Sequence, residues 1–517
     1  MSPRFKRLVL ISSILLFVSC TRPTPIPTPT PYSTPIPTSP PTATAPSEHA
    51  QALRPEFLAD LELFPDATRY EIELKVASNM TAVVGHERVI YTNTENVPLG
   101  ALYLRLFPNT PSYGGAMTAT NISLDGRPAA PVVELDGSAL RIPLEPPLEP
   151  GVRLDLALDF TVTVPTVVER GYGQFGYYDG ILALANVYPL VPVYDDAAAD
   201  HADALRPNAV GRHPGWNIEV APPYGDAIYS ETAFYTVRVT APADMTLIAS
   251  GNCTASASVS DGDKTWICVT GPMRDFNAIL GPDYRVESQV VEGVMVNSFF
   301  YSSHRRAGER VLDWAVETVR LFTRVGAYPF TELDVVETSN RAGGIEYPGL
   351  VVINTAFYEP IGEPLEWIVV HEAIHQWWYS LVGNDQVDEP WLDEALVQYS
   401  TLLYFEDRYG AEMAAELLEG TFQQAYESLV ESDRDMPVGL PIAAYSEQDY
   451  GPVIYQKGPL YFHALRREVG DENFWKILRT YFARNRYAVV TPEDWLAAVK
   501  AVTGDEHRAI YERWIER

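Results

Sequence analysis

The chain has 517 residues, of which 46% are hydrophobic, so it can form more than one folded domain with a large apolar core. Lysine and arginine total 38 against 68 aspartates and glutamates, which gives a formal net charge of −30 at pH 7. Because this charge repels a polyanion, we expect no nucleic-acid partner, and we interpret the acidity as that of a soluble, self-repelling surface.

The N-terminal segment is typical of an export signal. Three basic residues precede an apolar run of eleven residues, 8–18, which is too short to span a bilayer and suits a signal peptide. Phe17-Val18-Ser19-Cys20 resembles a bacterial lipobox, in which the cysteine carries lipid and becomes the mature N-terminus. We therefore expect a lipoprotein signal peptide over 1–20 and an exported, membrane-anchored protein at the cell surface or in the periplasm. An ordinary signal peptide cleaved nearby is the alternative.

The next segment, 21–47, is rich in proline and threonine. Proline at this density prevents a helix and leaves little apolar surface to bury, so the segment is predicted to be an extended, disordered linker. At ~3.1 Å per residue, such a linker reaches roughly 80 Å. We expect it to hold the folded part of the chain away from the membrane.

Residues 48–291 show the pattern of β-strands. Apolar and polar residues alternate from Tyr70 to Val76, and similar runs recur through the segment. Turn sequences such as Glu149-Pro150-Gly151 separate these runs. We predict an antiparallel β-sandwich-like domain over 48–291.

The chain contains three cysteines, and Cys20 belongs to the predicted lipobox. Cys253 and Cys268 remain as a pair in a domain that we expect to be exported. Export favours a disulfide between them, which would contribute on the order of 3 kcal/mol. Two separate buried thiols are the alternative.

From residue 292 to the C-terminus, helical periodicity replaces most of the alternation. Apolar residues from Val311 to Val325 share one helical face, and short strands follow at 333–336 and 350–353. Later helices are predicted at 392–409, 412–429, 459–468, 474–481 and 492–502. We therefore predict an α+β, multidomain protein in which 292–517 combine a small sheet with a mostly helical C-terminal lobe.

The segment 369–378 contains the pattern H-E-x-x-H. On a helix, His371 and His375 project from the same face, so both imidazoles can reach one cation. Glu372 lies beside them and can reach a water molecule without being a ligand. In isolation the pattern is weak, and a buried helix with two ordinarily hydrogen-bonded histidines is the alternative.

A catalytic zinc site has three protein ligands and one open position, so the motif needs a third ligand. Glu394 is our candidate, 19 positions after His375. This spacing allows the first helix to end near Val382 and a second helix to open around Pro390, with Gly383 in the loop between them. Glu394 would then face the histidines from the first turn of the second helix.

Together these residues resemble the aminopeptidase N family of zinc metallopeptidases, the gluzincins that also include leukotriene hydrolase. The two histidines, the intervening glutamate and the third ligand of that family match His371, Glu372, His375 and Glu394. Gly343-Gly344-Ile345-Glu346-Tyr347 is similar to the family's exopeptidase motif G-x-M-E-N, with Ile for Met and Tyr for Asn. Tyr455-Gln456-Lys457-Gly458 is similar to its Y-x-K-G element. The resemblance implies that the β-rich domain precedes a thermolysin-like zinc peptidase domain.

The resemblance also implies one zinc ion per chain and roles for the neighbouring side chains. Glu372 would act as general base, and Tyr455 would donate a hydrogen bond to the oxyanion of the intermediate. Glu346 would bind the α-ammonium group of a peptide by a charge-assisted hydrogen bond. Gly343 and Gly344 would let an extended substrate pair closely with their strand.

We therefore expect a monomeric zinc aminopeptidase that acts on peptides with a free N-terminus. The chain ends at Arg517, and we expect a short form without the large C-terminal domain of some family members. A zinc hydrolase of the same fold with endopeptidase or epoxide hydrolase activity is one alternative, and a non-catalytic binding protein is another. Glu346 separates the aminopeptidase from the endopeptidase, which does not need an amine anchor, and loss of Glu372 or of a ligand, which does not occur here, would favour the binding protein. Asn186 is one candidate for the second amine-binding side chain that family members take from the β-domain.

Overall fold

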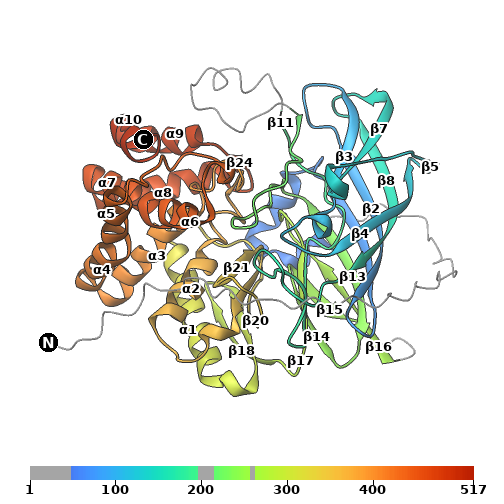
Figure 1. Ribbon diagram of the computed structural model, residues 1–517, viewed down its shortest axis with the longest axis horizontal. Coiled ribbons are helices and arrows are strands. Elements are labelled where there is room, and N and C mark those ends of the chain that lie inside the picture. Colours follow the sequence, from blue (N-terminus) through green and yellow to red (C-terminus); the bar gives the residue numbers. More distant parts are fainter. Residues whose placement is uncertain (1–47, 196–214, 257–261) are drawn as a thin grey trace. The chain divides into compact units, whose positions relative to one another are not determined.

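The computed structural model describes residues 48–195, 215–256 and 262–517, which belong to one compact unit. The predicted signal peptide with Cys20 and the predicted linker over 21–47 lie outside the described residues. Within the described residues, no helix combines the length and the apolar character needed to cross a membrane. Figure 1 traces the chain from the strands of the N-terminal domain to the helices that end it.

The described part of the N-terminal domain is built from three larger sheets and one two-stranded sheet. An eight-stranded sheet has the order β15 (Asn252–Ala255), β16 (Asp263–Val269), β13 (Phe234–Pro242), β1 (Arg69–Val76), β2 (Ala82–Thr92), β8 (Arg153–Thr163), β4 (Ala116–Leu124) and β5 (Arg127–Pro128). A four-stranded sheet has the order β14 (Met245–Ala249), β17 (Asn277–Pro282), β10 (Ile181–Ala185) and β9 (Phe175–Tyr178). A three-stranded sheet has the order β3 (Leu99–Arg105), β7 (Ala139–Leu148) and β6 (Val132–Glu134), and β11 (Tyr194–Asp195) pairs with β12 (Gly215–Trp216). The β-rich N-terminal domain predicted from the alternating pattern is confirmed.

One part of that prediction is wrong, because the eight-stranded sheet is not wholly antiparallel. β1 pairs in parallel with β13, and its other neighbour, β2, is antiparallel. β1 and β2 are consecutive and joined by a short turn, whereas the chain reaches β13 after a long crossing. A long connection allows either direction, and alternation along a strand carries no information about its neighbour's direction.

The two cysteines of the N-terminal domain form the predicted disulfide. Cys253 on β15 lies directly opposite Cys268 on β16, and their sulfurs are bonded. β15 is the edge strand of the eight-stranded sheet. The bond therefore fastens an edge strand, which has one strand neighbour, to the sheet.

The five-stranded sheet of the C-terminal part begins earlier than the predicted domain boundary at residue 291. Its order is β18 (Arg285–Val291), β19 (Val294–Phe300), β20 (Glu332–Thr338), β22 (Leu350–Asn354) and β21 (Gly344–Tyr347). Glu292 and Gly293 have φ angles of 49° and 81° and form a two-residue turn, so β18 and β19 are one hairpin. The change from one sheet to the next therefore falls between β17 and β18, not after β18.

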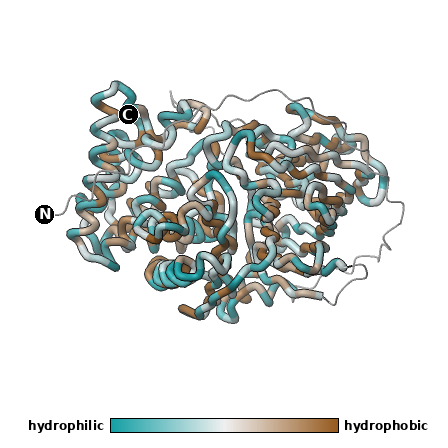
Figure 2. Tube along the Cα trace, turned by 60° about the horizontal axis from the view of Figure 1, so that its bottom comes forward, coloured by the Kyte–Doolittle hydropathy of each residue, from teal (hydrophilic) through white to brown (hydrophobic). Residues whose placement is uncertain are grey.

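The central strands of this sheet are buried on both faces, as their continuous apolar runs predict. Val335 and Val351 belong to the apolar core beneath the helices, whereas the neighbouring Val336 and Val352 belong to the core of the N-terminal domain. Figure 2 shows hydrophobic and hydrophilic residues interleaved along the strands and helices. One face of the sheet therefore packs against the helices, and the other face packs against the N-terminal domain.

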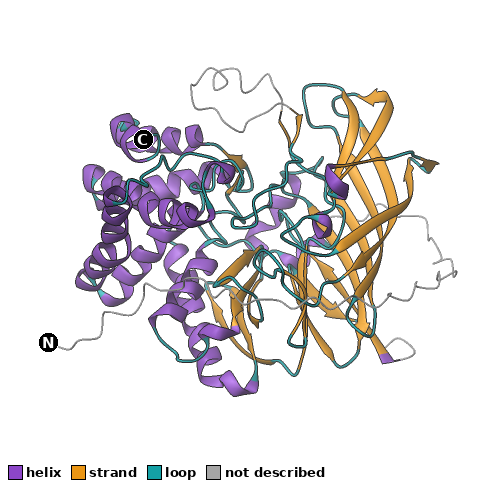
Figure 3. Cartoon of the chain, in the orientation of Figure 1, coloured by secondary structure: helices purple, strands orange, loops and turns teal. Residues whose placement is uncertain are grey.

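One long helix precedes β20, and helices make up most of the chain after β22, as Figure 3 shows. They are α1 (Arg305–Phe322), α2 (Glu363–Ile374), α3 (Glu394–Tyr409), α4 (Ala411–Leu417), α5 (Gln424–Glu431), α6 (Glu447–Gly451), α7 (Gly458–Val469), α8 (Asp471–Asn485), α9 (Pro492–Thr503) and α10 (Arg508–Trp514). Two π-helical turns, Leu418–Gln423 and Pro452–Lys457, interrupt the run, and β24 (Val489–Val490) pairs with β23 (Gly383–Asn384). The predicted helical lobe is confirmed.

The two helices of the H-E-x-x-H region are shorter than predicted. α2 ends at Ile374 instead of near Val382, because the following residues form turns and Tyr379 has a φ of 111°, outside the helical region. α3 begins at Glu394 instead of around Pro390, because the Asp393 side chain caps it by accepting from the Glu394 backbone N–H.

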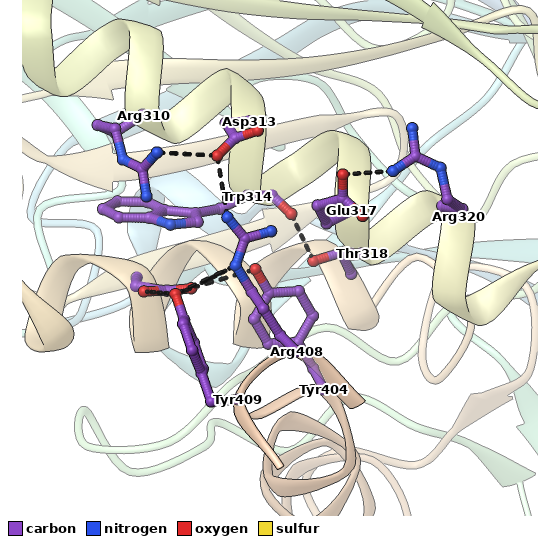
Figure 4. A network of polar contacts seen from close by, with 10 residues as sticks. Arg310, Asp313, Trp314, Glu317, Thr318, Arg320, Tyr404, Arg408 and Tyr409 are labelled. Atoms are coloured by element: carbon purple, nitrogen blue, oxygen red, sulfur yellow. Dashed lines mark hydrogen bonds and ion pairs between the residues drawn. The ribbon is translucent and has the colours of Figure 1, made fainter. Parts of the chain in front are cut away.

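A polar network ties the middle of α1 to the N-terminal part of α2 and the C-terminal end of α3 (Figure 4). Arg408 on α3 donates to Asp313 on α1 over 3.0 Å, and Tyr409 donates to Glu366 on α2 over 2.7 Å. Tyr404 donates to the same Glu366 oxygen over 3.2 Å. Since α2 and α3 carry the predicted metal ligands, these contacts hold the two helices in register at the ends away from the ligands.

Candidate metal centre

Three buried side chains from α2 and α3 converge at one point. His371 Nε2 lies 3.2 Å from Glu394 Oε2 and 3.1 Å from His375 Nε2. His375 Nε2 lies 3.4 Å from the same Glu394 oxygen. Two imidazole nitrogens and one carboxylate oxygen are a donor set typical of catalytic zinc, so the three predicted ligands fit the ion.

Hydrogen bonds from outside the donor set orient two of these side chains. His375 Nδ1 lies 3.0 Å from the Trp378 carbonyl oxygen, which can only accept, so Nδ1 carries the hydrogen and Nε2 is left as a donor atom for a cation. Tyr455 donates to Glu394 Oε1 over 2.6 Å, which leaves Oε2 facing the histidines. His371 Nδ1 is buried and has no hydrogen-bond partner among the described residues.

The charges of the donor set are coupled. Burial raises the pKa of Glu394, but the nearby His375 and the hydrogen bonds to both histidines outweigh it and hold this pKa well below its ordinary value. Burial by itself lowers the pKa of His375. The Glu346 and Glu394 carboxylates outweigh that effect, so the pKa of His375 lies well above its ordinary value. Glu394 is therefore an anion ready to bind a cation.

Glu372, the predicted general base, is buried beside the strand β21. A β-carbon added at Gly344 would lie 2.5 Å from Glu372 Cγ and 2.8 Å from Oε1, so only glycine fits there. Gly343 is also close-packed, since a β-carbon there would lie 3.2 Å from Ile368. Burial and the Glu346 carboxylate raise the pKa of Glu372 well above its ordinary value, which makes it a stronger base.

Glu346 lies on the same edge strand, next to the donor set. One of its oxygens is within 4.8 Å of a His375 ring nitrogen and of an Asp393 oxygen. Gln386 donates to Glu346 over 3.1 Å and to Asp393 over 2.9 Å, and so holds both carboxylates. Burial raises the pKa of Glu346, because the charged form loses water.

Tyr455 reaches the site from the π-helical turn Pro452–Lys457, a distortion that is frequent at functional sites. Gly458 lets this turn approach α3, since a β-carbon there would lie 2.6 Å from that of Ala395. Lys457 is buried and donates to Asp435 over 2.6 Å and to two backbone carbonyls. The Y-x-K-G element therefore supplies the site residue Tyr455, the lysine that fixes the turn to Asp435, and the glycine that allows close packing on α3.

Asp226 is a site residue that the sequence did not reveal. Its carboxylate lies within 4.8 Å of both Glu346 and Glu394. It comes from a loop of the N-terminal domain that docks on the helical lobe, where Tyr224 donates to the Tyr445 carbonyl over 2.8 Å. No motif or periodicity marks this loop, and an acidic residue beside a glycine is too common to single out.

Gln376 is a second residue that sequence reasoning missed. Its side chain donates to the Tyr347 carbonyl over 3.0 Å and accepts from the Gly349 N–H over 2.8 Å. It thereby joins the end of α2 to the end of β21, which carries Glu346. In the sequence, its position directly after His375 is the feature that could have indicated a role near the metal.

Comparison with known proteins agrees with this geometry. Residues 312–514 match the family described as Peptidase family M1 domain. Aminopeptidase M1-B of Oryza sativa subsp. japonica is 26% identical over 250 residues, which are 46% of this chain and 28% of that protein. Aminopeptidase N of Lactococcus lactis subsp. lactis is 27% identical over 159 residues, 29% of this chain and 18% of that protein. The chain thus aligns with less than a third of the length of these curated relatives.

Solved structures share the fold over most of the chain. The crystal structure of an M1 zinc metallopeptidase from Deinococcus radiodurans superposes with a TM-score of 0.62 at 21% identity, covering 87% of this chain and 94% of that one. A variant of that protein bound to a Tyr-Ser-Ala substrate gives the same TM-score at 20% identity. The resemblance to the aminopeptidase N family is therefore confirmed, since residues 312–514 match the Peptidase family M1 domain.

Proposed function

We propose that this protein is a zinc-dependent aminopeptidase that removes residues from the N-termini of peptides, with zinc held by His371, His375 and Glu394. The observation that carries the proposal is the position of two further carboxylates, Glu346 and Asp226, beside the metal donors. A peptidase that cleaves the first peptide bond must bind a free α-ammonium group within one residue of its metal. An acidic subsite next to the donor set provides for that need.

The spacing of the three carboxylates suits an ammonium group. Oxygens of Asp226, Glu346 and Glu394 are no more than 4.8 Å apart. A nitrogen at the centre of a triangle of that size lies about 2.8 Å from each corner, the length of a charge-assisted hydrogen bond. An ammonium group has three N–H donors, one for each carboxylate. Three carboxylates this close repel one another unless a cation or protons lie between them, so the subsite favours a cationic group.

The chain's own side chains then supply the proton transfers. When bound, zinc would polarise the attacking water and the scissile carbonyl. Glu372 takes the proton of the water molecule and returns it to the leaving amine, and its raised pKa suits both steps. Tyr455 is the candidate donor to the oxyanion, exchanging its present acceptor on Glu394 for the new negative charge.

The same site speaks against the alternatives of the sequence analysis. An endopeptidase or an epoxide hydrolase would hold the buried Glu346 and the partly buried Asp226 beside the metal without a positive charge to pair them, which costs free energy. A binding protein would not need a buried carboxylate at position 372, where the side chain has room only because residue 344 is a glycine.

We predict that Glu346→Ala lowers kcat/KM for free aminoacyl substrates by at least about tenfold. A hydrogen bond to a charged group in a desolvated site contributes about 1.5–3 kcal/mol, roughly ten- to a hundredfold in kcat/KM. Zinc content should not change, because Glu346 is not in the donor set. N-acetylated substrates should be poor for the wild-type enzyme, since they lack the charge. The measurement is kcat/KM on matched free and acetylated substrates, with and without a chelator.

Two further variants make this test specific. Asp226→Asn should weaken the same substrates, because it removes the second carboxylate of the subsite. Glu447→Gln removes an equal charge from an exposed position on α6 and should leave kcat/KM within about twofold. Equal cleavage of free and acetylated substrates by the wild-type enzyme would contradict the amine anchor and favour the endopeptidase.

We also propose that Cys20 carries a lipid anchor and that the protein works outside the cell. The basic start, the short apolar run and the Pro/Thr tract of the sequence support this proposal. Expression in a bacterial host should give a mature chain that begins with a lipidated Cys20. Mass spectrometry of the N-terminal peptide decides the question, and an unmodified chain starting elsewhere would contradict the proposal.

A further inference from the structure

We infer that Asp275, from the N-terminal domain, is a positioning residue for the zinc ligand His375 and acts through Tyr379 and the Trp378 carbonyl. The inference rests on the proposed zinc site. In addition to its part in binding substrate, the N-terminal domain would then help to orient a zinc ligand.

The first link is the bond between His375 Nδ1 and the Trp378 carbonyl oxygen, at 3.0 Å. This bond fixes which nitrogen carries the hydrogen and how the ring is turned. His371 has no such partner among the described residues, because its Nδ1 is buried and unpaired. The position of the Trp378 carbonyl therefore sets the orientation of His375.

The second link is Tyr379, the next residue along the chain. Its φ of 111° is rare for a residue with a side chain, and such a conformation persists only where the surroundings hold it. Both ends of Tyr379 are held by consecutive residues of the N-terminal domain. Its hydroxyl donates to Asp275 Oδ2 over 2.7 Å, and its carbonyl accepts from Arg274 Nε over 2.8 Å.

The third link is the rigidity of Asp275 and Arg274 themselves. Both are fully buried in the segment between β16 and β17. Asp275 Oδ1 accepts from Asn277 over 2.8 Å, and Asn277 in turn accepts from the Asn186 backbone N–H over 3.0 Å. Asn186, the amine-binding candidate of the sequence analysis, thus connects to this chain of bonds through its backbone.

Arg274 extends the same support to the helical lobe. It donates to the Ser230 carbonyl over 3.1 Å and to the Ala488 carbonyl. A β-carbon added at Gly383 would lie 2.0 Å from its guanidinium carbon, so glycine is required where the turn after α2 crosses it. The turn that carries Trp378 and Tyr379 is therefore clamped from two sides, and its carbonyl has little freedom to move.

The test is the zinc affinity of the full-length apoprotein with the conservative change Tyr379→Phe. This change keeps the ring and removes the hydroxyl that Asp275 holds. Loss of a partner that orients a ligand typically weakens metal binding by about 10- to 100-fold, and we expect the zinc Kd of Tyr379→Phe to rise at least about tenfold. Competition with a chelating indicator measures this Kd. Asp275→Ala should have the same effect, and the double variant should be no weaker than Asp275→Ala.

Tyr487→Phe is the matched control. Tyr487 is also buried and its hydroxyl also donates to a buried aspartate, Asp60, over 2.9 Å. Thermal unfolding of the apoproteins should show similar losses of stability for both tyrosine variants. The zinc Kd of Tyr487→Phe should stay within about twofold of the wild type. A purely structural role would move stability and zinc affinity together in both variants.

Unchanged zinc affinity in Tyr379→Phe, with zinc bound normally by the wild type, overturns the inference and leaves the Asp275–Tyr379 pair as a structural contact. An equal weakening in Tyr379→Phe and Tyr487→Phe overturns it as well. Failure of the wild-type chain to bind zinc contradicts the proposed function itself, so the two failures are distinguishable.

Discussion

We expect Glu372→Gln to keep its zinc and to lose about a thousandfold in kcat/KM, within the range typical of a lost general base. The amide has the shape of the carboxylate, so it fits the space beside Gly344 that a β-carbon would close. It cannot accept a proton from water. Glu372 is not one of the three donors that converge within 3.4 Å, so metal analysis should find one zinc per chain.

Glu366→Gln provides the control for this variant. Glu366 is a buried carboxylate near the other end of the same helix, and it accepts hydrogen bonds from Tyr404 and Tyr409. Its replacement should change stability and not turnover. Near wild-type turnover in Glu372→Gln would rule out the proposed mechanism, because that mechanism assigns both proton transfers to the Glu372 carboxylate.

The sequence was sufficient for the parts of the site that depend on local spacing. His371 and His375 are four positions apart on α2, and helical geometry alone brings their rings together. Glu394 followed from the need for a third ligand, even though the helix ends around it were predicted several residues away. The error did not matter, because a ligand needs the right side of a helix and not the right boundary.

The remaining site residues depend on contacts between distant segments, which neither period nor spacing reveals. Asp226 and Asp275 come from loops of the N-terminal domain and meet the metal centre only in the folded chain. Gln376 and Tyr379 lie beside the motif, but the spacing predicts that α2 continues through the turn in which they lie. A pattern of apolar residues could not show that turn, because α2 is buried on nearly all sides.

The fold shows the same division. Alternation and helical periodicity predicted the β-rich domain and the helical lobe, since both patterns follow from which face of an element is buried. The parallel pairing of β1 with β13 and the place of β18 in the second sheet are choices of partner strand. Partner choice depends on the tertiary packing of the two domains on the shared five-stranded sheet, which leaves no mark within a single strand.

The other large effect is expected for the ligands themselves: His375→Ala and Glu394→Ala should each lose most of their zinc. Each change removes one of three donors whose atoms lie 3.1–3.4 Å apart. Loss of an orienting partner weakens metal binding by about 10- to 100-fold, so loss of a ligand should weaken it by roughly a hundredfold or more.

Metal analysis after dialysis of the full-length chain measures this loss, and circular dichroism checks that both variants are folded. Glu346→Ala is the matched control, because it removes a buried carboxylate within 4.8 Å of a His375 ring nitrogen without removing a donor. Its zinc content should equal that of the wild type. Full zinc in both ligand variants would contradict the assigned site. Zinc loss in Glu346→Ala as well would mean that the acidic subsite, and not the three-residue donor set alone, holds the ion.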